Sequence, residues 1–237
     1  MCRRRCEKGG YAGACRDRDS EDESNTEVEA DRFCEQGPML TDILHRVVSN
    51  PTIYDTVQLV VGVSPHLDRR LAANLGETPA RPTILDVGGG TGLPPSLWPA
   101  GATYVCMDID PVKLAGFRRK DRPGVALRGD ATHLPVRTGS VDVVVCKNVT
   151  HHLRDAQVPP LFQESARVLK PGGRMLFIDA VRAPERWRSR ALWRFDRGAH
   201  PRLVATLRQS MAARFDIAHW EVFAYYHRYV FGVGVPL

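Results

Sequence analysis

The sequence predicts an α/β protein in which a mostly parallel sheet is covered by helices on both faces. Three observations lead to this prediction. From residue 83 onwards, short apolar runs typical of buried strands alternate with segments of helical apolar spacing. The first run ends directly in a glycine cluster. The next two runs each end at or beside an aspartate, at the edge where open α/β sheets bind their ligands.

The bulk composition is that of a small globular protein. Its 237 residues, 43% of them hydrophobic, fit one domain with a single buried core and a tail. No run approaches the roughly 18 apolar residues of a membrane-spanning helix. The N-terminus lacks the apolar segment of a secretory signal. We therefore expect a cytoplasmic protein that does not contact a membrane. The six cysteines have no metal-binding spacing, so we expect reduced thiols and no metal site.

Charge is distributed unevenly along the chain. Residues 1–36 hold seven basic and ten acidic residues, whereas residues 37–237 hold 26 basic and 17 acidic residues. A basic surface can bind a phosphate-rich partner. The alternative is that arginine, present in 28 copies against five lysines, serves simply as a solvated cation. We favour this second interpretation, which makes nucleic acid the less favoured partner.

The first quarter of the chain changes character near residue 37. Residues 1–36 are too polar to offset their ordering entropy by burial, which predicts a disordered tail. Apolar residues between positions 39 and 75 then recur at helical spacing, and Leu67, Leu71 and Leu75 share one face. This pattern predicts a helical cap over residues 37–76, before the first strand.

Seven strands are expected after this cap. They are residues 83–87, 103–107, 125–128, 141–146, 174–179, 215–221 and 226–233. We expect the last two to form an antiparallel finish. A helix is predicted before the fifth strand, where Leu161, Phe162, Ala166 and Leu169 have helical spacing. The prolines within residues 93–99 limit the segment after the glycines to a short helix.

The glycine cluster is the first candidate binding element. Glycines at positions 88, 89, 90 and 92 permit a tight strand-to-helix turn and let a ligand lie against bare backbone. A dinucleotide fingerprint would need a further glycine three positions after Gly90, where the sequence has Leu93. No Lys-Ser/Thr pair of a phosphate-binding loop follows either. The spacing therefore favours a Gly-x-Gly-x-Gly turn.

Carboxylates after the second and third strands are the next candidates. Asp108 ends the second strand, 16 residues after Gly92, and could accept hydrogen bonds from both hydroxyls of a ribose. Asp130 follows the third strand beside an exposed backbone amide, which suits the amine and ring nitrogen of adenine. A single acid in such a place could be a helix cap. Three acids at successive strand ends, counting Asp86, favour a ligand site.

Taken in order, these motifs resemble those of class I S-adenosylmethionine-dependent methyltransferases. The resemblance covers about residues 50–180 and is carried by four segments, namely residues 84–92, 107–111, 129–131 and 167–173. It implies a Rossmann-like, doubly wound sheet of strand order 3-2-1-4-5-7-6 with strand 7 antiparallel. It also implies methyltransferase activity with S-adenosyl-L-methionine as the cofactor. The short segment after Gly92 departs from the longer helix that members usually have there.

The resemblance further implies which residues contact the cofactor. Gly88 and Gly90 would border the methionine moiety, on a turn supported by Asp86. Asp108 would hold the ribose. The full implied set is Tyr54, Asp86, Gly88, Gly89, Gly90, Asp108, Ile109, Asp130, Ala131, Lys147 and Asn148. Within that set, Ile109 would pack on adenine, whose edge Asp130 and Ala131 would read. The backbone of Lys147 and Asn148 would pass near the cofactor. Tyr54, in a helix like that of small-molecule members, would help to cover it.

Two histidines after the fourth strand are the candidates for catalysis. A sulfonium methyl is a good electrophile, so most of the catalysis should come from in-line positioning. A positioned base could add about 10²–10⁴-fold in rate. His152 stands where family members often carry a histidine that in some deprotonates the acceptor, and His151 precedes it. The alternative is that either histidine only orders this loop through hydrogen bonds.

The domain organisation and acceptor follow from the parts outside the shared motifs. We expect a tail over 1–36 and a methyltransferase domain over 37–237, including a substrate lid at 182–212. Arginine and tryptophan interleaved within residues 186–194 favour an amphipathic lid over a base-stacking surface. We expect methyl transfer to O, N or C of a small organic acceptor, in specialised metabolism. The alternatives are an RNA or protein methyltransferase, or a fold that binds the cofactor without transferring methyl.

Overall fold

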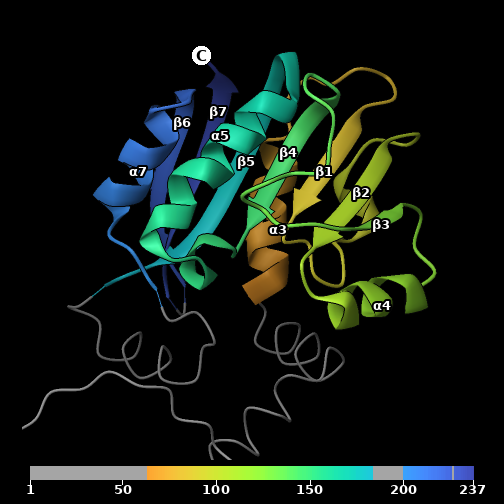
Figure 1. Ribbon diagram of the computed structural model, residues 1–237, viewed down its shortest axis with the longest axis horizontal. Helices are drawn as coiled ribbons and strands as arrows, with labels where there is room; N and C mark the ends of the chain where they lie inside the picture. Colours follow the sequence, from red (N-terminus) through yellow and green to blue (C-terminus); the bar gives the residue numbers. More distant parts are fainter. Residues whose placement is uncertain (1–62, 184–199, 226) are drawn as a thin grey trace, which may run out of the picture. The chain divides into compact units, whose positions relative to one another are not determined.

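The computed structural model describes residues 63–183, 200–225 and 227–237 (Figure 1), which all belong to one compact unit. Several predictions fall outside these residues. They concern the charged tail over 1–36, Tyr54 with the first part of the helical cap, and the arginine- and tryptophan-rich centre of the lid. None of the helices in the described part of the chain is long and apolar enough to cross a membrane.

The described strands form one seven-stranded sheet of order β3-β2-β1-β4-β5-β7-β6, which confirms the predicted fold (Figure 1). The strands are β1 (Thr83–Val87), β2 (Thr103–Asp108), β3 (Val125–Arg128), β4 (Val141–Lys147), β5 (Leu169–Val181), β6 (Phe215–Ala224) and β7 (Arg228–Pro236). Strands β1 to β5 pair in parallel, and β7 pairs antiparallel with both β5 and β6. The carboxyl ends of β1 to β5 therefore meet at one edge of the sheet.

The fifth strand differs from its predicted bounds. It was expected from residue 174 but begins at Leu169. The prediction of Leu169 as helical was wrong, because α5 ends at Val168 and Leu169 pairs with Val141 of β4. The register then shifts before the next pair, Val143 with Arg174. Gly172, at φ 77°, lies in the intervening segment.

Helices cover both faces of the sheet. They are α3 (Val63–Ala73), α4 (Pro111–Arg119), α5 (Val158–Val168) and α7 (Val204–Ala212). Alternate strand residues point to opposite faces, so the core has two halves. Leu85 and Val144 pack with residues of α5 and α7, whereas Ile84 and Val145 pack with residues of α3 and α4. Figure 1 shows α5 and α7 in front of the sheet and α3 behind it.

Helix α3 is held on the sheet by the predicted apolar face. Leu67 and Leu71 are 0% and 3% exposed, and burying one such side chain stabilises the fold by roughly 1.5–3 kcal/mol. Arg70 adds a polar attachment to the far edge of the sheet. Its guanidinium lies 3.7 Å over the ring of Phe223 and forms a 3.1 Å ion pair with Glu221, both on β6.

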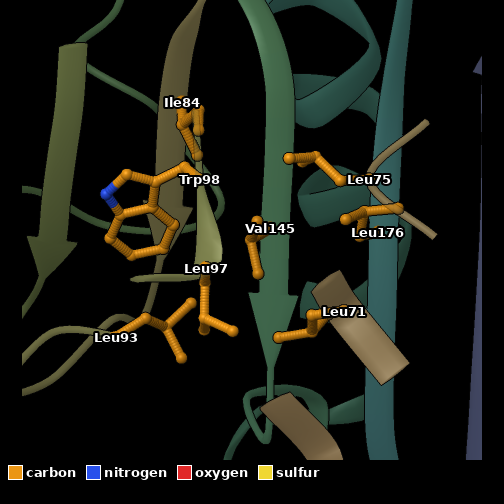
Figure 2. Close-up of a pocket in the computed structure, with 8 residues that line it drawn as sticks. All are labelled: Leu71, Leu75, Ile84, Leu93, Leu97, Trp98, Val145 and Leu176. Atoms are coloured by element: carbon orange, nitrogen blue, oxygen red, sulfur yellow. The ribbon is translucent and has the colours of Figure 1, made fainter. Parts of the chain in front are cut away.

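The segment after the glycines forms only a single 3-10 turn, η1 (Pro95–Leu97), as the prolines predict. An apolar pocket lies between η1 and α3. Its lining residues are Leu71, Leu75, Ile84, Leu93, Leu97, Trp98, Val145 and Leu176 (Figure 2). These side chains come from the interior of the sheet and from its helical cover rather than from the strand ends. The pocket is therefore a space that the short η1 leaves unfilled, and not a polar ligand site.

Candidate functional site

The turn after β1 depends on three glycines in the left-handed region. Gly88, Gly90 and Gly92 have φ values of 69°, 59° and 80°, which other residues adopt only at a cost. A Cβ on Gly88 would lie 2.5 Å from a methyl of Val149. A Cβ on Gly90 would lie 3.7 Å from the Lys113 side chain and 3.9 Å from a carboxylate oxygen of Asp108, at ordinary van der Waals distance, so its left-handed φ rather than a clash favours glycine there. The turn thus forms a cradle of bare backbone at the carboxyl end of β1.

Asp86 supports this turn from below. Its buried carboxylate accepts a 2.5 Å hydrogen bond from the hydroxyl of Tyr104, which in turn accepts a 3.0 Å bond from the amide of Leu93. Burial raises the pKa of Asp86 to about 7, against the opposing effects of the Tyr104 hydrogen bond and the charge of Lys147. Asp86 thus links β1 to β2 and to the segment after the glycines, as the supporting role implied by the resemblance requires.

Two cations hold the same segment from the other side. Lys120 Nζ donates a 2.8 Å bond to Thr91 Oγ1, and Arg122 Nη1 donates to the carbonyl oxygens of Gly92 and Leu93 at 3.2 and 3.3 Å. A regular helix after the glycines would satisfy these carbonyls internally. Sequence reasoning missed both contacts, which compensate for the helix that the prolines prevent.

Asp108 closes the site at the end of β2. Its two carboxylate oxygens accept bonds from the amides of Gly90 and Asp110, at 3.0 and 2.9 Å. The carboxylate therefore lies against the glycine turn, as the spacing predicted. Each carboxylate oxygen has a second lone pair that could accept a ligand hydroxyl. The neighbouring Ile109 is 63% exposed, so its apolar side chain is available to pack on a flat ligand.

Asp130 and Ala131 lie just after β3, next to the Asp108 strand in the sheet. Oδ1 of Asp130 accepts bonds from the amide and the hydroxyl of Thr132, both at 2.8 Å. Among the described residues, its other oxygen, Oδ2, accepts no hydrogen bond. One side of the carboxylate is therefore fixed by its own loop, and the other side remains available to a ligand.

The end of β4 brings in a charge pair that the sequence did not reveal. Lys147 Nζ contacts Asp68 Oδ1 of α3 at 2.7 Å, with both side chains largely buried. Asn148 follows in the left-handed region, at φ 58°, and its amide donates to the carbonyl oxygen of Ile178. Lys147 and Asn148 thus lie at the same sheet edge as the glycine turn. Nothing in the sequence pattern singled out Asp68 beyond its position on the predicted helix.

The two candidate histidines occupy the 3-10 turn η2 (Thr150–His152) and have different surroundings. His151 is buried, and its Nδ1 is hydrogen-bonded to Oδ1 of Asp179 on β5. Burial alone would raise the pKa of Asp179, but the charge of His151 and the hydrogen bonds from His151 and Thr150 hold it below its usual value. His152 is exposed, and its ring centroid lies 4.2 Å from that of His151.

Arg202 fixes this turn from the segment before α7, and sequence reasoning missed it. Its guanidinium donates to the carbonyl oxygens of Thr150 and Leu153, at 2.5 and 2.6 Å, and pairs with Asp155 at 2.8 Å. Its own carbonyl oxygen accepts a 2.8 Å bond from the amide of Arg182. Arg182 and Arg202, both within the predicted lid over 182–212, are therefore joined to each other, and Arg202 also holds the histidine turn.

The described site residues thus gather at one edge of the sheet, as predicted. This edge combines bare glycine backbone, several carboxylates with spare acceptor capacity and the lysine ammonium at the end of β4. Such a set suits an elongated ligand that carries hydroxyl groups at one end and a cation, because carboxylates accept from hydroxyls and stabilise cations. Asn148 adds a buried side-chain oxygen that has no hydrogen-bond partner among the described residues, and a ligand donor could satisfy it.

Comparison with known proteins finds methyltransferase sequences that are similar to part of this chain. Residues 85–177 match a family model described as a methyltransferase domain. An uncharacterised methyltransferase of Mycolicibacterium gilvum is 38% identical over 122 residues, which are 50% of this chain and 44% of that protein. The chain therefore covers less than half the length of this relative.

Solved structures show the same fold. The complex of the Haloferax volcanii Trm112 methyltransferase activator with a methyltransferase contains a chain similar to this one, with a TM-score of 0.66 at 17% identity. The match covers 81% of this chain and 97% of that chain. The geranyl diphosphate C-methyltransferase of Streptomyces coelicolor, solved with geranyl diphosphate and S-adenosyl-L-homocysteine, has a TM-score of 0.59 at 15% identity. Here the match covers 73% of this chain and 78% of that chain.

Proposed function

This chain carries a methyltransferase domain of the class I S-adenosylmethionine-dependent type, and on that premise we propose that it transfers a methyl group from S-adenosyl-L-methionine to a small organic acceptor. The observation that carries the proposal is the ordered set at the strand ends, where the glycine turn, Asp108 and Asp130 follow three neighbouring strands.

In this proposal the cofactor lies across the carboxyl ends of β1 to β4. The turn over Gly88 and Gly90 gives it backbone without side chains, and Asp86 supports that turn. Asp108 accepts from the ribose hydroxyls. Ile109, Asp130 and Ala131 hold the adenine, and Gly88, Gly89, Lys147 and Asn148 border the other end. Bound there, the cofactor supplies a methyl group activated by its sulfonium.

The protein contributes positioning and a place for the acceptor proton. His152 is exposed at the turn after β4, so its imidazole can receive a proton from an acceptor hydroxyl or amine. His151 is buried and hydrogen-bonded to Asp179, so its role in this proposal is to orient the turn. Arg202 donates hydrogen bonds to the carbonyl oxygens of Thr150 and Leu153. One residue of the predicted lid therefore stabilises the turn that carries the proposed base.

The choice of a small acceptor rests on the lid. Residues 182 and 202 are joined by a backbone hydrogen bond next to the histidine turn. Two residues of the predicted lid over 182–212 therefore lie beside the proposed acceptor site. A lid there would exclude water from the methyl transfer and suits a small molecule, in keeping with specialised metabolism. The basic residues of the C-terminal third favour RNA or a protein as the second candidate acceptor.

The experiment is a turnover assay with the purified full-length chain, labelled S-adenosyl-L-methionine and fractionated cell extract. Label should move into a small-molecule fraction with stoichiometric formation of S-adenosylhomocysteine. Label in RNA or protein would favour the second candidate, and RNA binding should then weaken steeply with salt. Tight cofactor binding without turnover in any fraction would identify a binding fold without methyl transfer. Absence of cofactor binding would refute the proposal.

A further inference from the structure

The ion pair between Asp68 and Lys147 connects the N-terminal helical cover to the sheet at the proposed cofactor site. Lys147 is the last residue of β4, and Asp68 lies in the second turn of α3. Their charged atoms are 2.7 Å apart, and the side chains retain 14% and 11% of their exposure. The pair is thus mostly buried at the carboxyl edge, where it is only weakly screened by solvent.

Strand alternation places Lys147 on the same face of the sheet as Asp86, the residue that supports the glycine turn. Ile84 and Val145 belong to the half of the core that packs against α3. Residues two positions further along a strand point the same way, so Asp86 and Lys147 share that face. The charges of Lys147 and Asp68 both act on the pKa of Asp86, in opposite directions. Asp68, Asp86 and Lys147 therefore form one electrostatic neighbourhood.

The pair leaves acceptor capacity that its own members do not use. Only Oδ1 of Asp68 contacts Lys147, and no donor in the described part of the chain reaches Oδ2. The next residue, Asn148, has a buried side-chain oxygen that likewise meets no donor. A simple tether between helix and strand would need neither oxygen. An unused carboxylate oxygen in an ion pair with a lysine ammonium, followed in the chain by an unused amide oxygen, matches a ligand group that carries both a cation and a carboxylate.

We propose that Asp68, Lys147 and Asn148 bind the amino-acid end of S-adenosyl-L-methionine, an inference that rests on the proposed function. Asp68 Oδ2 and Asn148 Oδ1 accept hydrogen bonds from the α-ammonium, and Lys147 Nζ pairs with the α-carboxylate. The direction follows from the sheet order. Asp108 and Asp130 follow β2 and β3 on one side of β1, so the opposite end of the ligand extends towards β4 on the other side. Helix α3 thereby becomes part of the cofactor site.

Three ligands separate this role from a structural one. S-adenosyl-L-methionine carries the whole amino-acid end, decarboxylated S-adenosylmethionine lacks its carboxylate, and 5′-methylthioadenosine lacks the whole end. Calorimetric titration of the full-length chain should show that Asp68→Asn weakens the first two ligands at least about tenfold, since a charge-assisted hydrogen bond is lost. Lys147→Met should weaken only S-adenosyl-L-methionine to that extent. Neither variant should change 5′-methylthioadenosine affinity by more than about twofold.

A charge swap and a second helix variant provide the controls. Asp68→Lys combined with Lys147→Asp keeps an ion pair between α3 and β4 but reverses its polarity. This double variant should still bind 5′-methylthioadenosine and lose S-adenosyl-L-methionine. Arg70→Met loosens α3 at its other attachment and should affect all three ligands alike.

The outcomes can be told apart. If Asp68→Asn weakens all three ligands equally, or if the charge swap restores S-adenosyl-L-methionine binding, the pair is only a tether and the inference is wrong. If the unmodified chain binds none of the three ligands, the proposed function itself fails. Should a single variant not fold, the charge swap alone still decides, because it retains the tether.

Discussion

The hydroxyl of Tyr104 on β2 donates a 2.5 Å hydrogen bond to Asp86 Oδ2 on β1 and accepts one from the amide of Leu93. These contacts connect two strands and the glycine turn through one buried phenol. Burial raises the pKa of the Tyr104 hydroxyl, an effect that the adjacent Asp86 charge reinforces, so the hydroxyl remains a donor at physiological pH. Of the two side chains in this contact, Asp86 is therefore the one whose protonation state changes at physiological pH.

The first prediction concerns the pH dependence of stability. The pKa of Asp86 rises from 3.8 to about 7 on folding. The native state therefore binds this proton more tightly than the unfolded state, so the contribution of Asp86 to stability is full below pH 4 and is lost as the pH rises to 7. Asp86→Asn keeps an acceptor for Tyr104 and should remove this component. The difference in melting temperature, variant minus wild type, should increase between pH 4 and 8.

Asp216, an exposed carboxylate on β6, is the matched control. Asp216→Asn should leave the pH dependence of the melting temperature parallel to that of the wild type. A parallel curve for Asp86→Asn as well would mean that Asp86 ionises normally in the folded protein.

The second prediction concerns the affinity for the cofactor. Asp108→Ala removes an acceptor for ribose hydroxyls and also the bond to the amide of Gly90. Because charge-assisted hydrogen bonds contribute roughly 1.5–3 kcal/mol each, calorimetry should show at least about tenfold weaker S-adenosyl-L-methionine binding. Asp110→Ala is the control. Asp110 caps α4 through the amide of Val112, so its loss should cost about 1 kcal/mol of stability and little affinity. Equal affinity losses in the two variants would place the ribose elsewhere.

The third prediction separates the two histidines. His152→Ala should lower kcat by about 10²–10⁴ if His152 accepts the substrate proton, with cofactor affinity nearly unchanged. Some activity should return at high pH, where an acidic acceptor ionises by itself. A fall in cofactor affinity would instead indicate that His152 orders the turn after β4. Wild-type activity on the true acceptor would exclude both roles.

His151 should respond differently, because it is buried against Asp179. His151→Ala leaves the Asp179 carboxylate without its cationic partner, and losing one member of a buried pair typically costs about 3–5 kcal/mol. Thermal unfolding should therefore show a large loss of stability for His151→Ala and a small one for His152→Ala. Similar stabilities for the two variants would contradict the scaffold role of His151.

The fourth prediction concerns the support of the glycine turn by Arg122. Arg122→Ala removes the donor to the carbonyl oxygens of Gly92 and Leu93. At about 1 kcal/mol for such partly buried hydrogen bonds, cofactor affinity should fall roughly fivefold in calorimetry. Arg122→Lys should recover part of the loss. Arg119→Ala, at an exposed position on α4, should leave the affinity unchanged. An unchanged affinity for Arg122→Ala would show that the turn holds its shape without this contact.

Local patterns in the sequence predicted the fold well. The bounds of β1 and β3 agree with their apolar runs. The prolines predicted that the segment after Gly92 would be short. The strand order came from the resemblance rather than from any run of residues, since apolar patterns do not identify neighbouring strands.

Only the residues of the candidate site that belong to a sequence motif were predicted. Gly88, Gly90, Asp86 and Asp108 were identified because each stands at a fixed distance from a strand end, and the structure brings them together. The cofactor roles assigned to them remain predictions. His151 and His152 were adjacent in sequence and could not be distinguished there. Their separation into a buried and an exposed residue depends on Asp179, which lies 28 residues away on β5.

The sequence by itself determined where the strands lie, that the turn after β1 needs glycine, and which carboxylates follow the strands, because these features depend on residues close together in the chain. Tertiary structure alone decided the partners of the charged groups. Asp68 meets Lys147 across 79 residues, and Arg202 reaches the carbonyl oxygen of Thr150 across 52. No local periodicity encodes such pairs, because a charge can be solvated in many places. It is buried only where the packing of α3 or of the segment before α7 brings a partner to it.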